Sequence, residues 1–295
     1  MQELIAKAEI LIESLPYIRA FADKTIVIKY GGQAMVNKDL KKRVMIDIIL
    51  LKYIGLNPIV VHGGGAEVTS LMERVGKKAE FVNGLRVTDK EVIELVEMVL
   101  VGKVNKEIVG LVNQYGGKAV GLSGKDSNLI IAQKRAPESM VVDGEEKIVD
   151  LGYVGDVVKI NPEVVNTLSK QGYIPVIATL GVDLNGESLN INADYVAGEL
   201  AAAISAEKLM LLTDVEGIFE DPEDEATLIS SLPREQALDM IKRGKISQGM
   251  IPKVQSCLKA LEHEVRRTHI VDGRIPHSLL LEIFTDEGIG TMVTE

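Results

Sequence analysis

The sequence has few of the features that mark secreted or membrane proteins. It contains one cysteine, Cys257, no tryptophan and only 4% aromatic residues. A single cysteine forms no disulfide within the chain, which is typical of a reducing compartment. No apolar run approaches the roughly 20 residues of a membrane helix. The N-terminus also lacks the basic region of a signal peptide. We therefore expect a cytoplasmic protein with no membrane partner.

Net positive charge is lacking too. The formal charge of −10 argues against nucleic acid or an anionic membrane as the main partner. An anion site in this chain must therefore be built locally, from a few cations and backbone N–H groups. At 295 residues with 46% hydrophobic side chains, the chain is long enough for one large α/β domain or two lobes.

Glycine, in contrast, is concentrated at one informative place. The β-branched run Ile59–Val61 predicts a short buried strand, and Gly63, Gly64 and Gly65 follow it at once. Residues 66–75 then show helical spacing of apolar side chains. A strand, a glycine turn and a helix N-terminus together let a backbone approach a ligand closely and present free N–H groups to an anion such as phosphate.

The common glycine motifs do not match this turn. A dinucleotide fingerprint requires glycine where Val68 stands, and a P-loop requires Ser or Thr where Asp126 follows Gly124 and Lys125. The His62–Gly65 turn is typical of an esterase oxyanion hole, but the nucleophile motif G-x-S-x-G fails because Lys125 replaces its last glycine. An esterase therefore remains the weaker alternative.

A second unit of the same kind precedes the first. Thr25–Tyr30 predicts a strand, Gly31 and Gly32 a turn, and Lys38–Ile54 a helix that leads to the strand at Ile59–Val61. A strand–helix–strand crossover of this length places its two strands parallel. Both glycine turns should then open at the same edge of the sheet, where open α/β sheets bind ligands.

The remaining pattern continues this alternation. We expect a helix from Asp89 that breaks at Gly102 and resumes to Tyr115, a β-rich antiparallel excursion over 128–160, and a helix over Leu232–Arg243. The apolar positions of residues 1–15 predict an amphipathic first helix that ends or kinks at Pro16. The predicted fold class is α/β, with a mostly parallel central sheet covered by helices on both faces.

Three cations occur in contexts that indicate an anionic ligand. Lys29 ends an apolar strand, where an ammonium is costly unless an anion lies nearby. Arg86 is set among apolar residues and has a fork that suits a carboxylate. Lys253 begins a helix with an apolar face, and Asp194, after Asn190 and Asn192, is placed to accept hydrogen bonds from both lysines.

With these residues in view, the chain resembles the N-acetylglutamate kinases of the amino-acid kinase superfamily. Seven segments carry the resemblance over nearly the whole chain: residues 28–32, 61–65, 83–88, 121–126, 190–194, 213–217 and 249–253. The two glycine turns belong to the superfamily at large, whereas the N-G-L-R-V-T and N-I-N-A-D segments are more particular to this kinase. Thr179-Leu180 and Gln248 depart from the family pattern, the latter in the nucleotide loop.

The resemblance implies a three-layer αβα sandwich that uses ATP and Mg²⁺, the metal being held mainly by the nucleotide phosphates, to phosphorylate N-acetyl-L-glutamate. It assigns catalysis to Lys29, Gly32, Gly64, Asp194 and Lys253. It assigns acetylglutamate binding to Gly64, Gly65, Arg86, Asn190 and Asn192. It assigns the nucleotide to Lys29, Asp214, Val215, Gly217, Ile218, Phe219, Lys245 and Lys253. It implies no protein-held metal. A sister kinase acting on another small carboxylate or on carbamate remains an alternative.

The resemblance also implies regulation and assembly. Residues 1–24 would form an oligomerisation helix, residues 25–180 the acetylglutamate-binding and dimerisation lobe, and residues 181–295 the nucleotide-binding lobe. Family members with such an N-terminal helix and a C-terminal segment like 281–291 resemble the hexamers, trimers of dimers, that L-arginine inhibits. By this resemblance Tyr17, Glu282 and Gly288 would bind arginine, with Glu282 facing the guanidinium.

Overall fold

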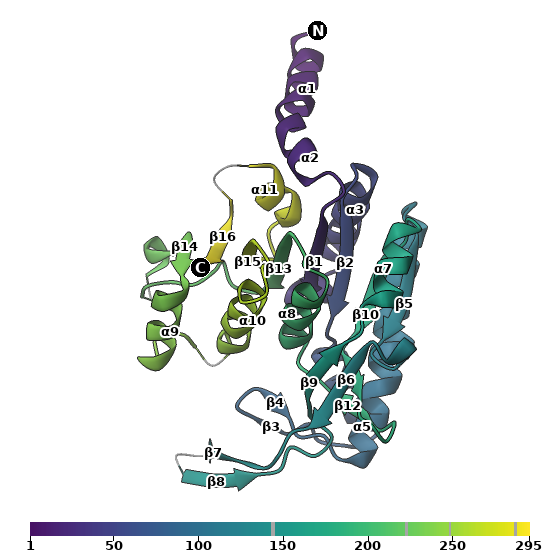
Figure 1. Ribbon diagram of the computed structural model, residues 1–295, viewed down its shortest axis with the longest axis vertical. Helices are drawn as coiled ribbons and strands as arrows, with labels where there is room; N and C mark the ends of the chain where they lie inside the picture. Colours follow the sequence, from purple (N-terminus) through teal and green to yellow (C-terminus); the bar gives the residue numbers. More distant parts are fainter. Residues whose placement is uncertain (143–144, 222–223, 248, 286–287) are drawn as a thin grey trace.

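The computed structural model describes residues 1–142, 145–221, 224–247, 249–285 and 288–295. A single eight-stranded sheet runs through the body of the molecule in the order β14-β16-β15-β13-β1-β2-β10-β5 (Figure 1). Neighbouring strands are parallel except for β15 and β16, which are antiparallel. The strands are β1 Thr25–Tyr30, β2 Asn57–His62, β5 Ala119–Ser123, β10 Ile174–Ala178, β13 Lys208–Thr213, β14 Ser231–Pro233, β15 Arg267–Asp272 and β16 Gly290–Thr294.

Helices cover both faces of this sheet, because its strands are apolar on both sides. Along β1, Ile26 and Ile28 point to one buried cluster and Val27 to the other, as the two-residue period of a strand requires. The first face packs against α3 Lys38–Tyr53, α4 Gly65–Arg74, α5 Lys90–Glu97, α6 Asn105–Gln114 and α11 Ser278–Phe284. The second packs against α7 Glu163–Lys170, α8 Ala193–Ala203, α9 Arg234–Lys242 and α10 Ile251–Leu261. The predicted α/β class with a mostly parallel sheet is confirmed.

Smaller sheets extend the body at the end away from the N-terminus (Figure 1). One has the order β12-β11-β6-β9, and two hairpins pair β3 with β4 and β7 with β8. Their bounds are β3 Phe81–Val82, β4 Leu85–Arg86, β6 Ile130–Lys134, β7 Glu138–Val142, β8 Glu145–Val149, β9 Gly155–Ile160, β11 Leu180–Val182 and β12 Ser188–Asn190. The β6–β9 and β7–β8 pairs are antiparallel, which confirms the predicted excursion over 128–160.

The N-terminal extension projects from the opposite end of the molecule as α1 Gln2–Glu13, followed by α2 Leu15–Phe21 (Figure 1). Pro16 lies in the first turn of α2, where its missing N–H costs no hydrogen bond. The first helix therefore ends just before Pro16, close to the predicted break. Ile10, Leu11 and Ile12 of α1 are 64%, 72% and 68% exposed, so the apolar stripe of this helix is not covered by its own chain.

Two predicted boundaries were wrong. The helix does not break at Gly102, because α5 continues through a π-helix, η2 Met98–Val104, into α6. Glycine lowers helix stability by about 1 kcal/mol, and buried Val99 and Leu100 outweigh that cost. The helix expected from Leu232 begins at Arg234 instead, because Leu232 pairs with β16 in an edge strand. None of the described helices is long and apolar enough to cross a membrane.

Candidate active site

The two glycine turns meet at the carboxyl edge of the sheet, as the parallel strands require. Tyr30 and His62 are register partners at the ends of β1 and β2, and Gly31 and Gly63 follow them. Gly32 has a φ of +67°, and a Cβ there would lie 2.2 Å from Oδ1 of Asp214. Only glycine fits this position, so the first turn passes directly beside the end of β13.

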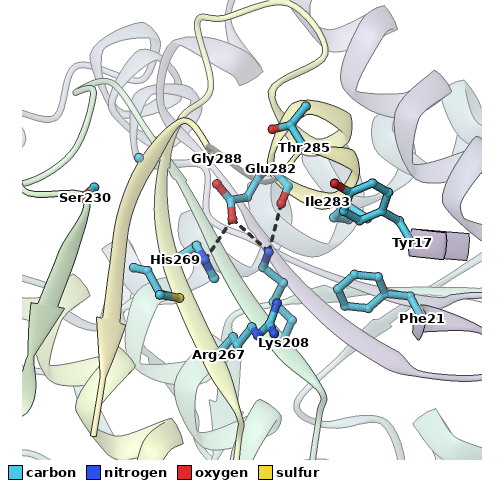
Figure 2. A pocket seen from close by; sticks show the side chains of 12 residues that line it. Tyr17, Phe21, Lys208, Ser230, Arg267, His269, Glu282, Ile283, Thr285 and Gly288 are labelled. Carbon is cyan, nitrogen blue, oxygen red and sulfur yellow. Dashed lines mark hydrogen bonds and ion pairs between the residues drawn. The ribbon is translucent and has the colours of Figure 1, made fainter. Parts of the chain in front are cut away.

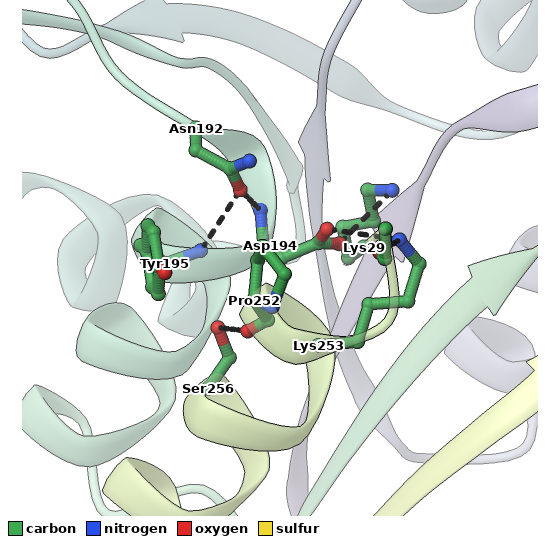
Figure 3. A network of polar contacts seen from close by, with 8 residues as sticks. Lys29, Asn192, Asp194, Tyr195, Pro252, Lys253 and Ser256 are labelled. Carbon is green, nitrogen blue, oxygen red and sulfur yellow. Dashed lines mark hydrogen bonds and ion pairs between the residues drawn. The ribbon is translucent and has the colours of Figure 1, made fainter. Parts of the chain in front are cut away.

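Lys29, Asp194 and Lys253 form an ion-pair cluster beside these turns (Figure 3). Lys29 Nζ is 3.0 Å from Asp194 Oδ1, and Lys253 Nζ is 3.2 Å from Asp194 Oδ2. The Lys29 side chain reaches the same sheet face as Val27, which is the face that α8 and α10 cover. Sequence analysis predicted this arrangement of one carboxylate between two ammonium groups.

Asp194 is ionised in this environment. Burial alone would raise its pKa, but the charges of Lys29 and Lys253 outweigh burial and hold the pKa below its ordinary value. With two cations for one carboxylate, the cluster keeps an excess positive charge. Such a charge favours an anionic ligand at the adjoining helix N-terminus.

Close packing of α8 on α10 sets the spacing of the cluster. A Cβ at Gly198 would lie 2.8 Å from the carbonyl oxygen of Ser256, so this glycine lets the two helices approach. Ser256 Oγ donates to the Pro252 carbonyl at 2.7 Å, in the first turn of α10 (Figure 3). Asn192 caps α8, and its Oδ1 accepts from the Asp194 N–H at 2.8 Å. The side-chain oxygen of Asn192 is thus occupied by the helix, although the residue still lines two cavities described below.

Several cavities open beside the cluster or elsewhere among the described residues, and the four discussed here are each named by one lining residue. The Arg86 cavity, of about 200 Å³, is lined by all five residues predicted to bind acetylglutamate, namely Gly64, Gly65, Arg86, Asn190 and Asn192. The Lys29 cavity, of about 320 Å³, contains Lys29, Gly32, Gly64, Asp194 and Asp214 in its lining. The Phe219 cavity, of about 190 Å³, is lined by Val215, Gly217, Ile218, Phe219, Lys245, Ile246, Ser247 and Met250. The Glu282 cavity is separate and is treated last.

The Arg86 and Lys29 cavities share the turn Gly63–Gly65. Ligands in these two cavities would therefore meet at the backbone of that turn. The lining of the Phe219 cavity includes Val215, which follows Asp214 of the Lys29 cavity in the chain. Its lining is mostly apolar, which suits a ligand with a flat aromatic ring. Gln248, the other residue expected near the nucleotide, lies outside the described residues.

Arg86 is buried, and hydrogen bonds fix its orientation. Its Nη2 donates to the Gly65 carbonyl at 2.8 Å and to Thr69 Oγ1 at 2.7 Å, and its guanidinium lies 4.6 Å from the centre of the Phe81 ring. Within the described ranges no carboxylate lies in ion-pair distance of Arg86. Burial lowers its pKa, but a guanidinium stays charged at neutral pH. The cavity thus contains a buried cation suited to a carboxylate ligand.

The Glu282 cavity, of about 330 Å³, lies at the other end of β13 (Figure 2). Its lining includes the three residues predicted to bind arginine, Tyr17, Glu282 and Gly288. Tyr17 of α2 meets Phe284 of α11 edge-to-face, with ring centres 6.4 Å apart. Asp286 and Glu287, which belong to the predicted C-terminal segment, lie outside the described residues.

Glu282 already has partners in this cavity. Its Oε1 lies 2.9 Å from both Lys208 Nζ and His269 Nε2 (Figure 2). Its Oε2 accepts from the Ile289 N–H at 3.1 Å. Burial raises the pKa of Glu282, but the hydrogen bond from His269 and the charge of Lys208 outweigh it and bring the pKa to about 2. Glu282 is therefore an ionised, paired carboxylate.

Sequence analysis missed two of these partners, Lys208 and His269. A usable signal existed for Lys208, because this lysine begins an apolar strand just as Lys29 ends one. The signal was ambiguous, since nothing in the sequence shows which carboxylate 74 residues away completes the pair. Glu67, which lines the Lys29 cavity, was also missed. In the part of the chain that the structure describes, no group of three or more His, Cys, Asp or Glu side chains is arranged to hold a metal ion.

Fold and site together define a phosphoryl-transfer protein of the amino-acid kinase type. A sequence model described as the amino acid kinase family matches residues 24–272, and the chain belongs to this family. Its curated relatives narrow the match to the acetylglutamate kinases. It is 58% identical to acetylglutamate kinase from Moorella thermoacetica, over 98% of this chain and 97% of that protein. It is 53% identical to acetylglutamate kinase from Methanocaldococcus jannaschii, over 100% and 98%.

Solved structures agree on the fold. N-acetylglutamate synthase from Neisseria gonorrhoeae, complexed with coenzyme A and N-acetyl-glutamate, matches with a TM-score of 0.82 at 26% identity. The match covers 98% of this chain and 63% of that longer one. Carbamate kinase from Giardia lamblia matches with a TM-score of 0.62 at 16% identity, over 92% of this chain and 99% of that one, a likeness of fold alone.

Proposed function

We propose that this protein transfers the γ-phosphoryl group of ATP to the γ-carboxylate of N-acetyl-L-glutamate. The observation that carries the proposal is the position of the Lys29–Asp194–Lys253 cluster beside the turn where the Arg86 and Lys29 cavities meet. The names of relatives that match nearly the whole chain support the same substrate.

The chemistry requires no general base. A carboxylate with a pKa of about 4.3 is already an ionised nucleophile at neutral pH. One carboxylate oxygen forms a bond to the γ-phosphorus, the bond to the β-phosphate oxygen breaks, and ADP leaves with the electron pair. The main barrier is the repulsion of two anions that must be held in line.

The residues of the site address that repulsion. Arg86, with Asn190 and the Gly65 backbone, holds the substrate carboxylates in the Arg86 cavity. Lys29 and Lys253 neutralise charge on the transferring phosphoryl group, and Asp194 orients both ammonium groups. Backbone N–H groups of Gly32 and Gly64 complete the binding of the equatorial oxygens, as in an oxyanion hole. Asp214 and the Phe219 cavity accommodate ATP.

Mg²⁺ accompanies the nucleotide in this proposal. In this proposal the ion is held mainly by the nucleotide phosphates. When bound, the ion neutralises phosphate charge. The work of this chain is to place the two substrates and exclude water around them.

Coupled measurement of ADP release tests the proposal. Acetylglutamate should support turnover about 10²-fold faster than glutamate, aspartate or carbamate. Glutamate would bring an ammonium group where acetylglutamate has a neutral amide, aspartate is one methylene shorter, and carbamate has only one carboxylate. Trapping of the product with hydroxylamine should detect an acyl phosphate. Equal turnover with carbamate or aspartate would instead favour a sister kinase, and hydrolysis of a simple ester without ATP would favour the esterase.

We further propose a division of labour between two lobes. Residues 25–180 would bind acetylglutamate and dimerise, and residues 181–295 would bind the nucleotide. Most of the lining of the Arg86 cavity comes from the first range, whereas the residues that line the Phe219 cavity, listed above, all belong to the second range.

Arginine inhibition is proposed for the Glu282 cavity. Bound arginine would separate the Glu282–Lys208 ion pair and take the place of each partner. The carboxylate of arginine would then face Lys208, and its guanidinium would face Glu282. The exposed stripe of α1 supports the proposal that this helix packs on another subunit in a hexamer of three dimers. Arginine can shift activity only by as much as its affinity differs between two arrangements of the lobes.

Deletion of residues 1–20 tests both parts. The truncated protein should be an active dimer that arginine no longer inhibits, whereas the full chain should scatter light as a hexamer. A Tyr17→Ala variant distinguishes the loss of the arginine site from the loss of the hexamer. It should stay hexameric and respond to arginine more weakly. A dimeric full-length protein, or a truncated enzyme that keeps its arginine response, would contradict this proposal.

A further inference from the structure

The turn Gly63–Gly65 lines two cavities, and two buried side chains lie behind it. His62, the last residue of β2, and Asn105, the first residue of α6, are both 0% exposed. They are joined to each other and to the backbone of the sheet. Their arrangement bears on how the glycine turn is held, and the inference below rests on the proposed function.

The hydrogen bonds of His62 define its proton position. Nδ1 lies 2.8 Å from the Gly63 carbonyl oxygen, and Nε2 lies 3.0 Å from Asn105 Nδ2. A carbonyl oxygen only accepts and an amide nitrogen only donates, so Nδ1 has the proton and Nε2 accepts. Burial lowers the pKa of His62 to about 4, so the ring is neutral at physiological pH. Both ring nitrogens are occupied, which leaves no site for a substrate proton.

Asn105 connects three neighbouring strands from the first face of the sheet. Its Nδ2 also donates to the Val176 carbonyl of β10 at 2.9 Å. On β5, a Cβ at Gly121 would lie 1.8 Å from Asn105 Oδ1, so Gly121 provides the space that this side chain occupies. Lys106 Nζ donates to the same Oδ1 at 3.1 Å. The glycine that begins the G-L-S-G-K-D segment thus has a packing reason.

The π-helix η2 supports the turn from the same side. A Cβ at Gly64 would lie 2.7 Å from Leu100 Cδ2 and 3.2 Å from Val104 Cγ2, so η2 packs directly against the glycine turn. A π-turn contains one extra residue, which rotates the following helix relative to an uninterrupted α-helix. Asn105, immediately after η2, is turned inward to the sheet by this rotation.

We propose that His62 and Asn105 are positioning residues that aim the Gly64 N–H at the transferring phosphoryl group. The Gly63 carbonyl and the Gly64 N–H belong to one planar peptide group and point in opposite directions. A hydrogen bond that fixes the carbonyl therefore fixes the N–H. His62 makes that bond, and Asn105 holds the ring in the tautomer that can make it.

A graded set of variants tests the proposal by steady-state kinetics. His62→Asn keeps an N–H near the Gly63 carbonyl and should lower kcat by only about 3-fold. His62→Leu loses both bonds and should lower kcat by about 10- to 100-fold, with the KM of ATP and of acetylglutamate changed by less than about 3-fold. The exposed His263, replaced by Asn, is the matched control and should leave kcat unchanged.

An NMR measurement supplies a readout that folding alone does not move. With ¹⁵N-histidine in the full chain, wild-type His62 should show the Nδ1–H tautomer and no titration between about pH 5.5 and 8.5. Asn105→Asp replaces a donor by an acceptor, so His62 must donate from Nε2 as well and should begin to titrate. The melting curve of each variant is measured first, and the variants are compared at a temperature at which all of them have the same folded fraction.

The outcomes separate the two levels of inference. A wild-type protein without acetylglutamate kinase activity contradicts the proposed function, whatever the tautomer of His62. An active wild type with an Nε2–H tautomer, or a folded His62→Leu variant with unchanged kcat, overturns the positioning role alone. A large rise in KM without loss of kcat would also overturn it, because the turn would then bind substrate rather than the transition state.

Discussion

Among the buried carboxylates of the described residues, Asp194 and Glu282 each lie between two basic side chains, at opposite edges of one sheet. The two clusters that they form differ in net charge. At the carboxyl edge, Asp194 is shared by Lys29 and Lys253. At the amino edge, Glu282 is shared by Lys208 and His269. Burial lowers the pKa of His269, so this histidine is neutral at pH 7 and the second cluster is balanced. The first cluster has one cation in excess.

The net charge of each cluster determines which ligands it can bind. An excess cation beside helix N-termini attracts phosphate, so the carboxyl edge suits a reaction between anions. A balanced pair must exchange partners to admit a ligand, which suits a zwitterion with its own cation. Strand β13 connects the two places, from Lys208 at its start to Thr213 beside Asp214, a distance of about 17 Å.

The largest effect is expected from removing the excess charge. Lys29→Ala and Lys253→Ala should each lower kcat by roughly 10²-fold or more, because in the proposed reaction these ammonium groups act on charge that develops in the transition state. The acetylglutamate KM should move much less. Lys24→Ala, which removes a half-exposed lysine just before the same strand, is the control. A Lys29→Ala enzyme with normal kcat would remove the catalytic role of the first cluster.

Glu282→Gln should cost stability rather than catalytic rate. It leaves Lys208, only 2% exposed, without a carboxylate, and breaking such a buried pair costs about 3–5 kcal/mol of unfolding free energy. The folded-state pKa of about 2 lies below the ordinary 4.5, so ionised Glu282 stabilises the protein above pH 4.5 and this contribution is lost as pH falls toward 2.

Urea unfolding at pH 7 and near pH 3 measures this effect. The gap between wild type and Glu282→Gln should be large at pH 7 and smaller in acid. Glu262→Gln removes an exposed partner of Arg234 and should cost less than about 1 kcal/mol. Equal losses for the two variants would show that the second cluster is not a buried pair in solution.

Arg86→Lys tests the isolated cation that belongs to neither cluster. A lysine cannot reproduce the fork that reaches Gly65 and Thr69, so the acetylglutamate KM should rise about 10-fold. The ATP KM should be nearly unchanged. Arg74→Lys, at the exposed end of α4, is the matched control. A changed ATP KM with a normal acetylglutamate KM would move Arg86 to the nucleotide side.

The smallest effect is expected from His269→Gln. Glutamine keeps an N–H that can donate to Glu282, and a neutral histidine contributes no charge to lose, so stability at pH 7 should change by less than about 1 kcal/mol. A destabilisation as large as that of Glu282→Gln would mean that His269 is charged. The two clusters would then have the same net charge, and the comparison would fail.

Much of the candidate site was predictable because its signals are local. Ile59–Val61 before Gly63–Gly65 predicts a strand, a turn and a helix N-terminus from residues that are neighbours in the chain, and the structure has all three. Lys29 was identified as a cation in need of an anion because its own strand is apolar. The helix break predicted at Gly102 was wrong, since the packing of η2 outweighs the low helix propensity of glycine.

The α/β class and the cations and carboxylates available to the site follow from the amino-acid sequence alone, because hydrophobic period and residue type are properties of short stretches. Which of these cations and carboxylates pair depends on the tertiary structure. Lys208 reaches Glu282 because β13 and α11 pack together, and Asn105 fits against Gly121 because η2 turns it inward. Such partners are far apart in the chain. Their interaction becomes strong only after folding has buried them, because the dielectric of the interior is low.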